Sequence, residues 1–162
     1  MELTDVLLTF AQAAMVIAGF GGVVIALHDK LDKWSEWDRV QFKSILDISG
    51  LVVFFSVLPI VLHSLLSAGM SWRISIVLFA LVHAGIIINY RSSVERESIP
   101  AVFARAHIVA AVIILSQLIS SIVGNQGVTE ILYSFGLFWL IGVGGWLFYL
   151  LAIGTHLSGE DE

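Results

Sequence analysis

The sequence predicts an all-α polytopic membrane protein, a single transmembrane domain built as a bundle of five transmembrane helices. Of the 162 residues, 58% are hydrophobic and 13% are charged, and the mean hydropathy is +0.95. Soluble domains carry about a quarter charged residues, and a soluble fold of this length could not bury so much apolar surface. The second observation is that the apolar residues fall into five long stretches separated by short polar segments.

Each apolar stretch is close to the roughly 20 residues that a helix needs to cross a hydrocarbon core of about 30 Å. In that core the backbone must satisfy its own hydrogen bonds, so helices are the expected form. The predicted helices cover about residues 3–28, 36–68, 72–90, 101–123 and 129–155.

The first helix carries a ridge of small residues spaced four apart. Small residues let two helix backbones approach closely in a membrane. The preferred interpretation is packing against a neighbouring helix of the same chain, and the alternative is packing in a homo-oligomer or lining a pore. The ridge consists of Ala14, Ala18, Gly22 and Ala26.

The second helix is predicted to begin near Glu36, because residues 35–38 resemble a capping box. A helix from there to residue 68 would be about 50 Å long at 1.5 Å per residue, so it must project from the membrane, tilt or bend. Pro59 is the expected hinge, since proline removes the hydrogen bond to the carbonyl of Phe55.

The loop before this helix, residues 29–43, mixes charges of both signs with apolar residues at intervals of three. That spacing places the apolar groups on one side of a helix, which suits an amphipathic segment in the headgroup layer. A surface for docking a partner is the alternative. The apolar residues are Leu31, Trp34, Trp37 and Val40.

The remaining helix limits follow from turn residues. Gly69, Gly124 and Gly127 are expected in tight turns, and Pro100 suits the first turn of the fourth helix. Tyr133, in the fifth helix, is expected to anchor the outer membrane interface.

Seven of the eight basic residues lie in or beside the two loops that follow the first and third helices. The positive-inside rule therefore predicts an outer N-terminus and a cytoplasmic C-terminus. The expected location is a cell membrane, either a plasma membrane or a bacterial inner membrane. The seven are Lys30, Lys33, Arg39, Lys43, Arg91, Arg96 and Arg105, and the exception is Arg73.

Four polar residues form a candidate pathway, because counting residues along each helix places them at successive depths. Intramembrane polar groups usually face a bundle interior or a hydrated cavity. The alternative is that each makes an isolated interhelical hydrogen bond worth about 0.6 kcal/mol. The four are Gln12, His63, His83 and Gln117.

A second polar cluster is expected at the inner boundary, where Asp47 and Arg105 would form a salt bridge. A sharper hypothesis is a gate, since histidines with a pKa of about 6.5 change charge between about pH 5 and 8. The histidines come from separate helix ends without metal-ligand spacing, so no metal site is expected. The cluster comprises Asp47, Arg105, His107, His28, Asn89 and His156.

Recognisable enzyme signatures are missing from the sequence. It contains no G-x-S-x-G, no H-E-x-x-H, no P-loop and no cysteine. We therefore expect neither an enzyme nor a bound cofactor, and the lack of a basic face argues against nucleic-acid binding.

Two functional classes stay open. In the first, the chain self-associates into an oligomeric channel or transport protein for ions or small solutes. In the second, it is an accessory or scaffolding subunit that binds another membrane protein. The first predicts a continuous hydrated path within the lipid bilayer, and the second predicts an unfilled packing groove.

Overall fold

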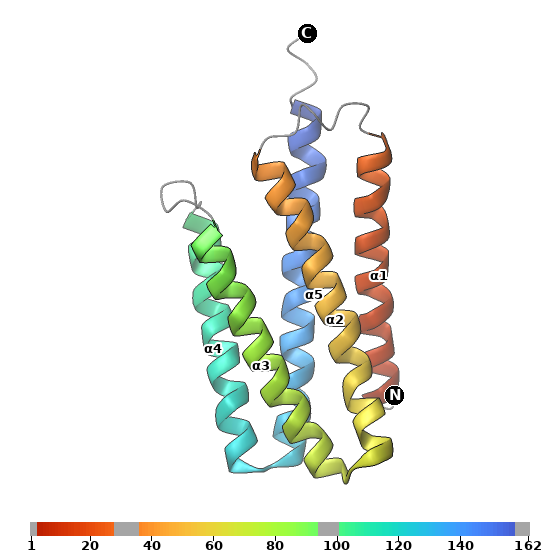
Figure 1. Cartoon of the computed structure of the whole chain (residues 1–162), viewed down its shortest axis with the longest axis vertical. Coiled ribbons are helices and arrows are strands. Elements are labelled where there is room, and N and C mark those ends of the chain that lie inside the picture. Colours follow the sequence, from red (N-terminus) through yellow and green to blue (C-terminus); the bar gives the residue numbers. More distant parts are fainter. Residues whose placement is uncertain (1–2, 28–35, 94–100, 158–162) are drawn as a thin grey trace. The chain divides into compact units, whose positions relative to one another are not determined.

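The structure is a computed structural model that describes residues 3–27, 36–93 and 101–157, and within these ranges it is helical without strands (Figure 1). All five helices are long and apolar enough to span a membrane. The predicted all-helical class and the five apolar helices are thereby confirmed. The helices are α1 (Leu3–Leu27), α2 (Glu36–Leu65), α3 (Ala68–Ser93), α4 (Ala101–Val123) and α5 (Gln126–Leu157).

Two predicted features fall outside these ranges. His28 and residues 29–35, which form the first part of the predicted amphipathic loop, lie in a part of the chain that the structure does not describe. Residues 36–43, the rest of that predicted loop, form the first turns of α2.

The connection between α2 and α3 is shorter than predicted. Ser67 is the last residue before α3, and its carbonyl oxygen accepts a hydrogen bond from the N–H of Ser71 at 2.9 Å. This bond starts α3 at Ala68. Gly69 was expected in the turn, and the structure corrects this because Gly69 lies in the first turn of the helix.

The connection between α4 and α5 depends on a glycine and an asparagine. Gly124 has a φ of 77°, a left-handed conformation that favours glycine, and its N–H donates to the carbonyl of Ser120 at 3.1 Å. Asn125 Oδ1 then accepts the N–H of Val128 at 3.2 Å, as an N-cap residue does. Gly124 is confirmed as a turn residue, whereas Gly127 lies inside α5.

The helices form two compact units, and the division passes through α2 and α5. We call residues 1–57 and 137–162 unit 1, and residues 58–136 unit 2. Pro59 lies inside the continuous helix α2, close to this division. Its action as a hinge stays a prediction.

Unit 1 packs α1, most of α2 and the second part of α5 around an aliphatic core. The helices approach closely at two glycines: a Cβ at Gly21 would lie 3.4 Å from Phe42, and one at Gly144 would lie 3.4 Å from Ile48. The buried hydrophobic residues are Leu7, Ala11, Ala14, Ile45, Ile48, Leu51, Val52, Phe55, Leu137, Leu140, Leu147 and Leu151.

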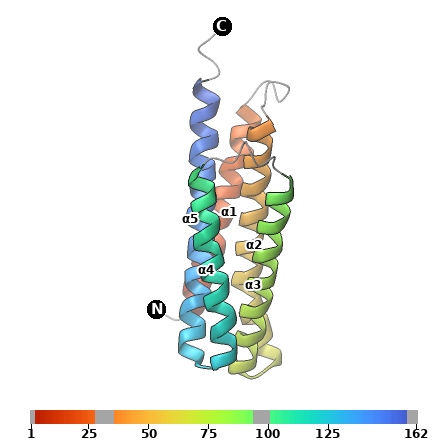
Figure 2. The same ribbon diagram turned by 90° about the vertical axis from the view of Figure 1, so that its left-hand side faces the viewer.

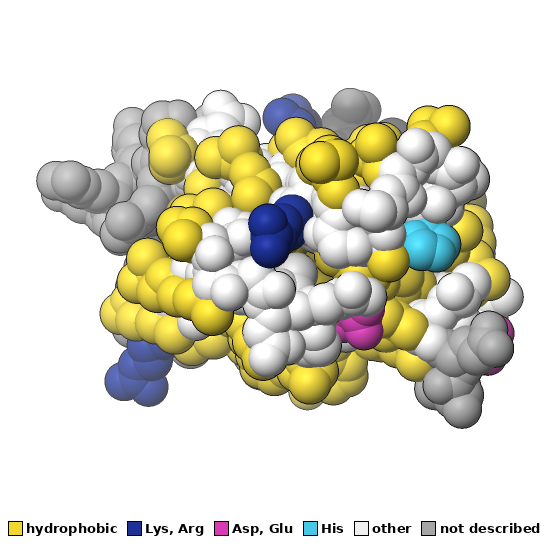
Figure 3. All heavy atoms as spheres, turned by 90° about the horizontal axis from the view of Figure 1, so that it is seen from below, with side chains coloured by type: hydrophobic (Ala, Val, Ile, Leu, Met, Phe, Trp, Pro, Cys, Tyr) yellow, Lys and Arg dark blue, Asp and Glu magenta, His cyan; other side chains and the backbone are white. Residues whose placement is uncertain are grey.

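Unit 2 packs α3 and α4 side by side, with the start of α5 and the end of α2 (Figures 1 and 2). Charged side chains are scattered among hydrophobic and uncharged groups at the end that carries the α2–α3 and α4–α5 turns (Figure 3). Glycine and proline aside, half of the buried residues that the structure describes in unit 2 are polar. They are Ser71, Ser75, His83, Gln117, Ser120 and Thr129, beside Ile76, Phe79, Ala80, Ala110, Ile113 and Tyr133.

Tyr133, whose expected role as an anchor at the outer membrane interface stays a prediction, is fully buried in unit 2. Its ring packs between two aromatic residues of α3, and this contact accounts for the burial.

Candidate functional site

The aromatic residues of α3 and α5 form a continuous row through the core of unit 2. Tyr133 packs against Trp72 with ring centroids 5.5 Å apart and an interplanar angle of 74°. Its other neighbour is Phe79, at 5.3 Å. Phe79 in turn stacks on His83 at 5.8 Å and 22°. Trp72, Phe79 and His83 share a face of α3 because their spacings are near whole helical turns.

Gln117 joins α4 to the backbone of α5. Its Nε2 donates a hydrogen bond to the carbonyl oxygen of Leu132 at 3.2 Å. A Cβ at Gly136 would lie 2.6 Å from Phe79 Cε1 and would also clash with Gln117 Nε2. Because Gly136 has no side chain, the Gln117 amide and the Phe79 ring can both lie against the backbone of α5.

A second polar contact joins the same two helices. Ser120 Oγ and Thr129 Oγ1 lie 2.8 Å apart in the buried core. Thr129 Oγ1 also donates to the carbonyl of Asn125 at 3.0 Å. A hydroxyl has one proton to donate, so in this pair Ser120 is the donor and Thr129 the acceptor.

Four buried polar atoms of unit 2 lack hydrogen-bond partners among the described residues: His83 Nδ1, Gln117 Oε1, Ser75 Oγ and Ser134 Oγ. The residues that carry the first three, His83, Gln117 and Ser75, are 3%, 0% and 0% exposed. A buried polar group without a partner costs about 1–3 kcal/mol, and a lipid bilayer offers no water to replace the missing bond. We call Ser75, His83, Gln117, Ser120 and Thr129 the polar core and treat it as the candidate site.

The four residues of the predicted pathway differ in how deeply the structure buries them. His83 and Gln117 are buried in unit 2. His63, also in unit 2, is exposed, and so is Gln12 in unit 1. His107 of α4, predicted for the inner cluster, lies close enough to His83 to interact with it electrostatically.

The other described members of the predicted inner cluster belong to different units. Asp47 is exposed in unit 1, whereas Arg105 and Asn89 are exposed in unit 2. The Asp47–Arg105 salt bridge stays a prediction. His28 and the side chain of His156 lie outside what the structure describes.

The small-residue ridge of α1 is only partly covered by the chain. Ala14 is buried and Ala18 is half-buried, but Gly22 and Ala26 are exposed. Residues spaced four apart drift around a helix by about 40° per step, so the far end of the ridge turns away from α2. The close contact with α2 falls at Gly21 instead.

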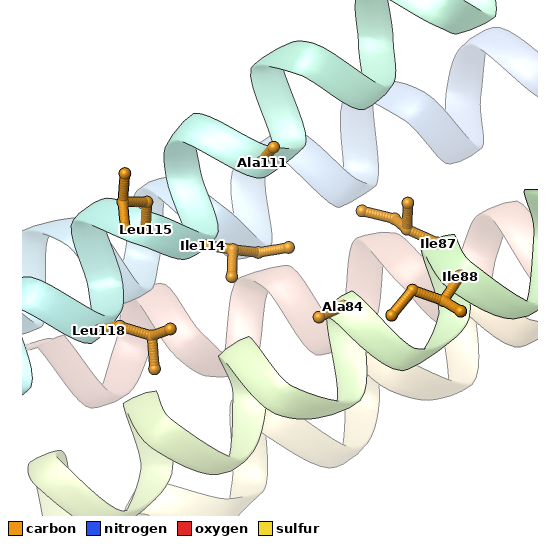
Figure 4. A pocket seen from close by; sticks show the side chains of 7 residues that line it. All are labelled: Ala84, Ile87, Ile88, Ala111, Ile114, Leu115 and Leu118. Atoms are coloured by element: carbon orange, nitrogen blue, oxygen red, sulfur yellow. The ribbon is translucent and has the colours of Figure 1, made fainter.

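Beyond the polar core, the described residues form an apolar groove and no cluster of metal ligands. Residues 3–27, 36–93 and 101–157 contain no group of three or more His, Asp or Glu that could hold a metal ion. An open groove of about 420 Å³ lies between α3 and α4 and offers only hydrocarbon side chains (Figure 4). Its lining is Ala84, Ile87, Ile88, Ala111, Ile114, Leu115 and Leu118.

Sequence reasoning missed three of the five polar-core residues: Ser75, Ser120 and Thr129. A signal for the first was present, since Ser71, Ser75 and His83 stand at multiples of four and therefore lie along one face of α3. The pairing of the other two depends on how α4 meets α5, which no single-helix pattern contains.

No protein-family model matches this sequence, and no curated protein or solved structure shows significant similarity to it.

Proposed function

We propose that this chain is a cell-membrane protein that assembles as a homo-oligomer and provides a path for ions or small solutes across the bilayer. Its N-terminus lies outside and its C-terminus lies in the cytoplasm. The distribution of Lys and Arg supports this orientation, because seven of the eight lie in or beside the two loops on the cytoplasmic side.

The chain has no cysteine, so single cysteines can report the orientation without background. A cysteine that replaces Gln126, at the start of α5, should react with an impermeant thiol reagent added outside intact cells. A cysteine that replaces Lys33 should react only after the membrane is opened. The reverse pattern would show the opposite orientation.

The observation that carries the transport proposal is the set of unpartnered polar atoms in the polar core. Three buried groups in apolar spans keep unused hydrogen-bonding capacity. Intramembrane polar residues usually mark a solute or ion path, or face a water-filled space. A path through unit 2 would supply the missing partners for His83 Nδ1, Gln117 Oε1 and Ser75 Oγ.

The test is flux through vesicles that contain the purified full chain. Wild-type protein should pass at least one member of a panel of K⁺, Na⁺, Cl⁻, protons and glycerol faster than empty vesicles. His83→Leu should reduce that flux, since it removes both ring nitrogens from the core. Leu65→Ala is the matched control, because Leu65 is 74% exposed at the end of α2. If no solute of the panel enters these vesicles faster than it enters empty vesicles, the proposal is refuted.

The inner cluster adds a proposed gate. Replacing Asp47 or His107 with an apolar residue should change how flux depends on pH between about 5 and 8, where histidine changes charge. A wild-type flux that is constant over this pH range would contradict the gate, but it would not contradict the proposed path.

An accessory role is the second candidate, and the exposed part of the α1 ridge favours it. Cβ atoms built at Gly19 and Gly22 meet no other atom within 4 Å, so this face has room for the backbone of another helix. Gly22→Leu should then abolish assembly while leaving the monomer folded. Native mass spectrometry of the complex from native membranes separates the candidates: a homo-oligomer supports the path, and a stoichiometric unrelated subunit supports the accessory role.

A further inference from the structure

Polar groups stand on both sides of Phe79 in unit 2. Along α3, Ser75 lies one turn before Phe79 and His83 lies one turn after it. The Phe79 ring is fully buried, stacks on His83 and packs against Tyr133. The apolar ring of Phe79 therefore lies between the polar residues Ser75 and His83 on this face of α3.

Gln117 reaches the same point from α4. Its amide and the edge of Phe79 both meet the backbone of α5 at Gly136, where no side chain separates them. The amide Nε2 is used by Leu132, and Oε1 is the atom that keeps no partner. Phe79 thus lies beside Gln117, which carries a buried unpartnered acceptor, and stacks on His83, whose Nδ1 is also buried and unpartnered.

We propose that the polar core is a proton path, in which water binds to Gln117 Oε1 and to His83 Nδ1 and Phe79 is the hydrophobic constriction between the two water sites. Apolar constrictions gate membrane paths by excluding water. This inference rests on the proposed transport function and specifies the conducted species.

The side chains of the polar core favour protons over metal ions. Ser75, Ser120 and Thr129 carry hydroxyls that both donate and accept hydrogen bonds, and a neutral His83 carries one donor and one acceptor nitrogen. A proton passes such groups by exchange along hydrogen bonds. None of the five polar-core residues is an Asp, Glu, Lys or Arg, so a dehydrated metal ion would meet no opposite charge.

The exchange at His83 conserves protons and charge. One ring nitrogen takes a proton from a hydronium ion at the bound-water site, which becomes water. The other nitrogen releases its proton to the next water, which becomes hydronium, so the ring ends neutral in its other tautomer. The next proton can pass once a ring rotation restores the first tautomer. The titratable groups beside this part of the core are His107 of α4, which lies near His83, and Tyr133 of α5, which packs against Phe79.

The experiment measures proton entry into vesicles that contain the full chain and a trapped pH-sensitive dye, with K⁺ and valinomycin to hold the voltage. Phe79→Ala should raise the proton flux about tenfold or more, because it removes the dewetted constriction. Phe135→Ala is the matched control, since Phe135 is 52% exposed on α5. Its flux should equal that of the wild type.

A second variant keeps the test informative if Phe79→Ala fails to fold. Gln117→Leu has a similar volume and removes the water-binding Oε1, so it should lower the proton flux to the level of empty vesicles. Gln126→Leu is its control, because Gln126 is exposed and bonds only to Glu130 on its own helix in the structure.

The outcomes separate this inference from the proposed function. Vesicles that pass K⁺, Na⁺, Cl⁻ or glycerol but no protons would overturn the proton path and leave the transport function standing. A wild-type proton flux that Phe79→Ala and Gln117→Leu both leave unchanged would also overturn it. Vesicles in which neither the wild type nor Phe79→Ala passes any member of the panel would overturn both proposals.

Discussion

The two units of this chain fill their cores with different chemistry. In unit 1, twelve of the fifteen buried side chains that the structure describes are hydrophobic, whereas in unit 2 the proportion is six of twelve, glycine and proline being left out of both counts. Among the described residues, unit 1 has one buried polar atom without a hydrogen-bond partner, Ser56 Oγ. Unit 2 has four: His83 Nδ1, Gln117 Oε1, Ser75 Oγ and Ser134 Oγ.

The difference follows from the physics of helices in lipid. Lipid tails are as apolar as leucine, so the hydrophobic effect does not drive helices together, and packing and interhelical hydrogen bonds hold them. Unit 1 relies on close packing at Gly21 and Gly144. Unit 2 adds hydrogen bonds from Gln117 and Ser120.

The largest expected effect tests the packed core of unit 1. Ile45→Ala should lower the free energy of unfolding by about 2–5 kcal/mol, because it opens a cavity at a fully buried position. Ile122→Ala, at a position 83% exposed, should change it by less than about 0.5 kcal/mol. Denaturant unfolding in detergent micelles measures both. Equal effects would show that the burial of Ile45 does not stabilise unit 1.

A smaller effect is expected where unit 2 leaves no room for a side chain. Gly136→Ala should destabilise the fold by about 1–3 kcal/mol, since its Cβ would press on Phe79 and Gln117. Gly142→Ala is the control, because a Cβ there meets nothing within 4 Å. The thermal midpoints of the two variants should differ clearly. A Gly136→Ala midpoint at or above that of Gly142→Ala would contradict the close contact.

The smallest effect concerns a single hydrogen bond of unit 2. Ser120→Ala removes the donor to Thr129 and should cost about 0.6 kcal/mol, the average for such bonds between membrane helices. Ser116→Ala removes a hydrogen bond to Val112 on the same helix. The difference between the two variants in the free energy of unfolding therefore gives the contribution of the bond between α4 and α5. A double-mutant cycle with Thr129→Val measures the coupling. A coupling energy of zero would mean that α4 and α5 gain nothing from this bond.

Single-helix patterns identified part of the candidate site. His83 and Gln117 were predicted as intramembrane polar residues, and both lie in the polar core. Gln12 and His63 were predicted on the same grounds and are exposed. Depth along a helix can be counted from the sequence, but the direction in which a side chain points depends on which neighbours the helix meets.

The glycines also show that a local sequence pattern does not determine a residue's place in the tertiary structure. Gly69, Gly124 and Gly127 all resemble turn residues, yet only Gly124 takes a positive φ. Capping hydrogen bonds at Ser67 and Asn125 decide where α3 and α5 begin. Gly136, which admits Gln117 and Phe79, stands in an apolar stretch with nothing local to distinguish it.

The sequence by itself determined that this is a helical protein with five apolar segments of membrane-spanning length, because composition and segment length express how each stretch of chain interacts with its solvent. Only the tertiary structure decided which polar residues meet. The contacts of Gln117 with Gly136 and of Ser120 with Thr129 join separate helices, and their geometry follows from how whole helices pack. Solvent preference is a local property of the chain, whereas a site is a property of several helices at once.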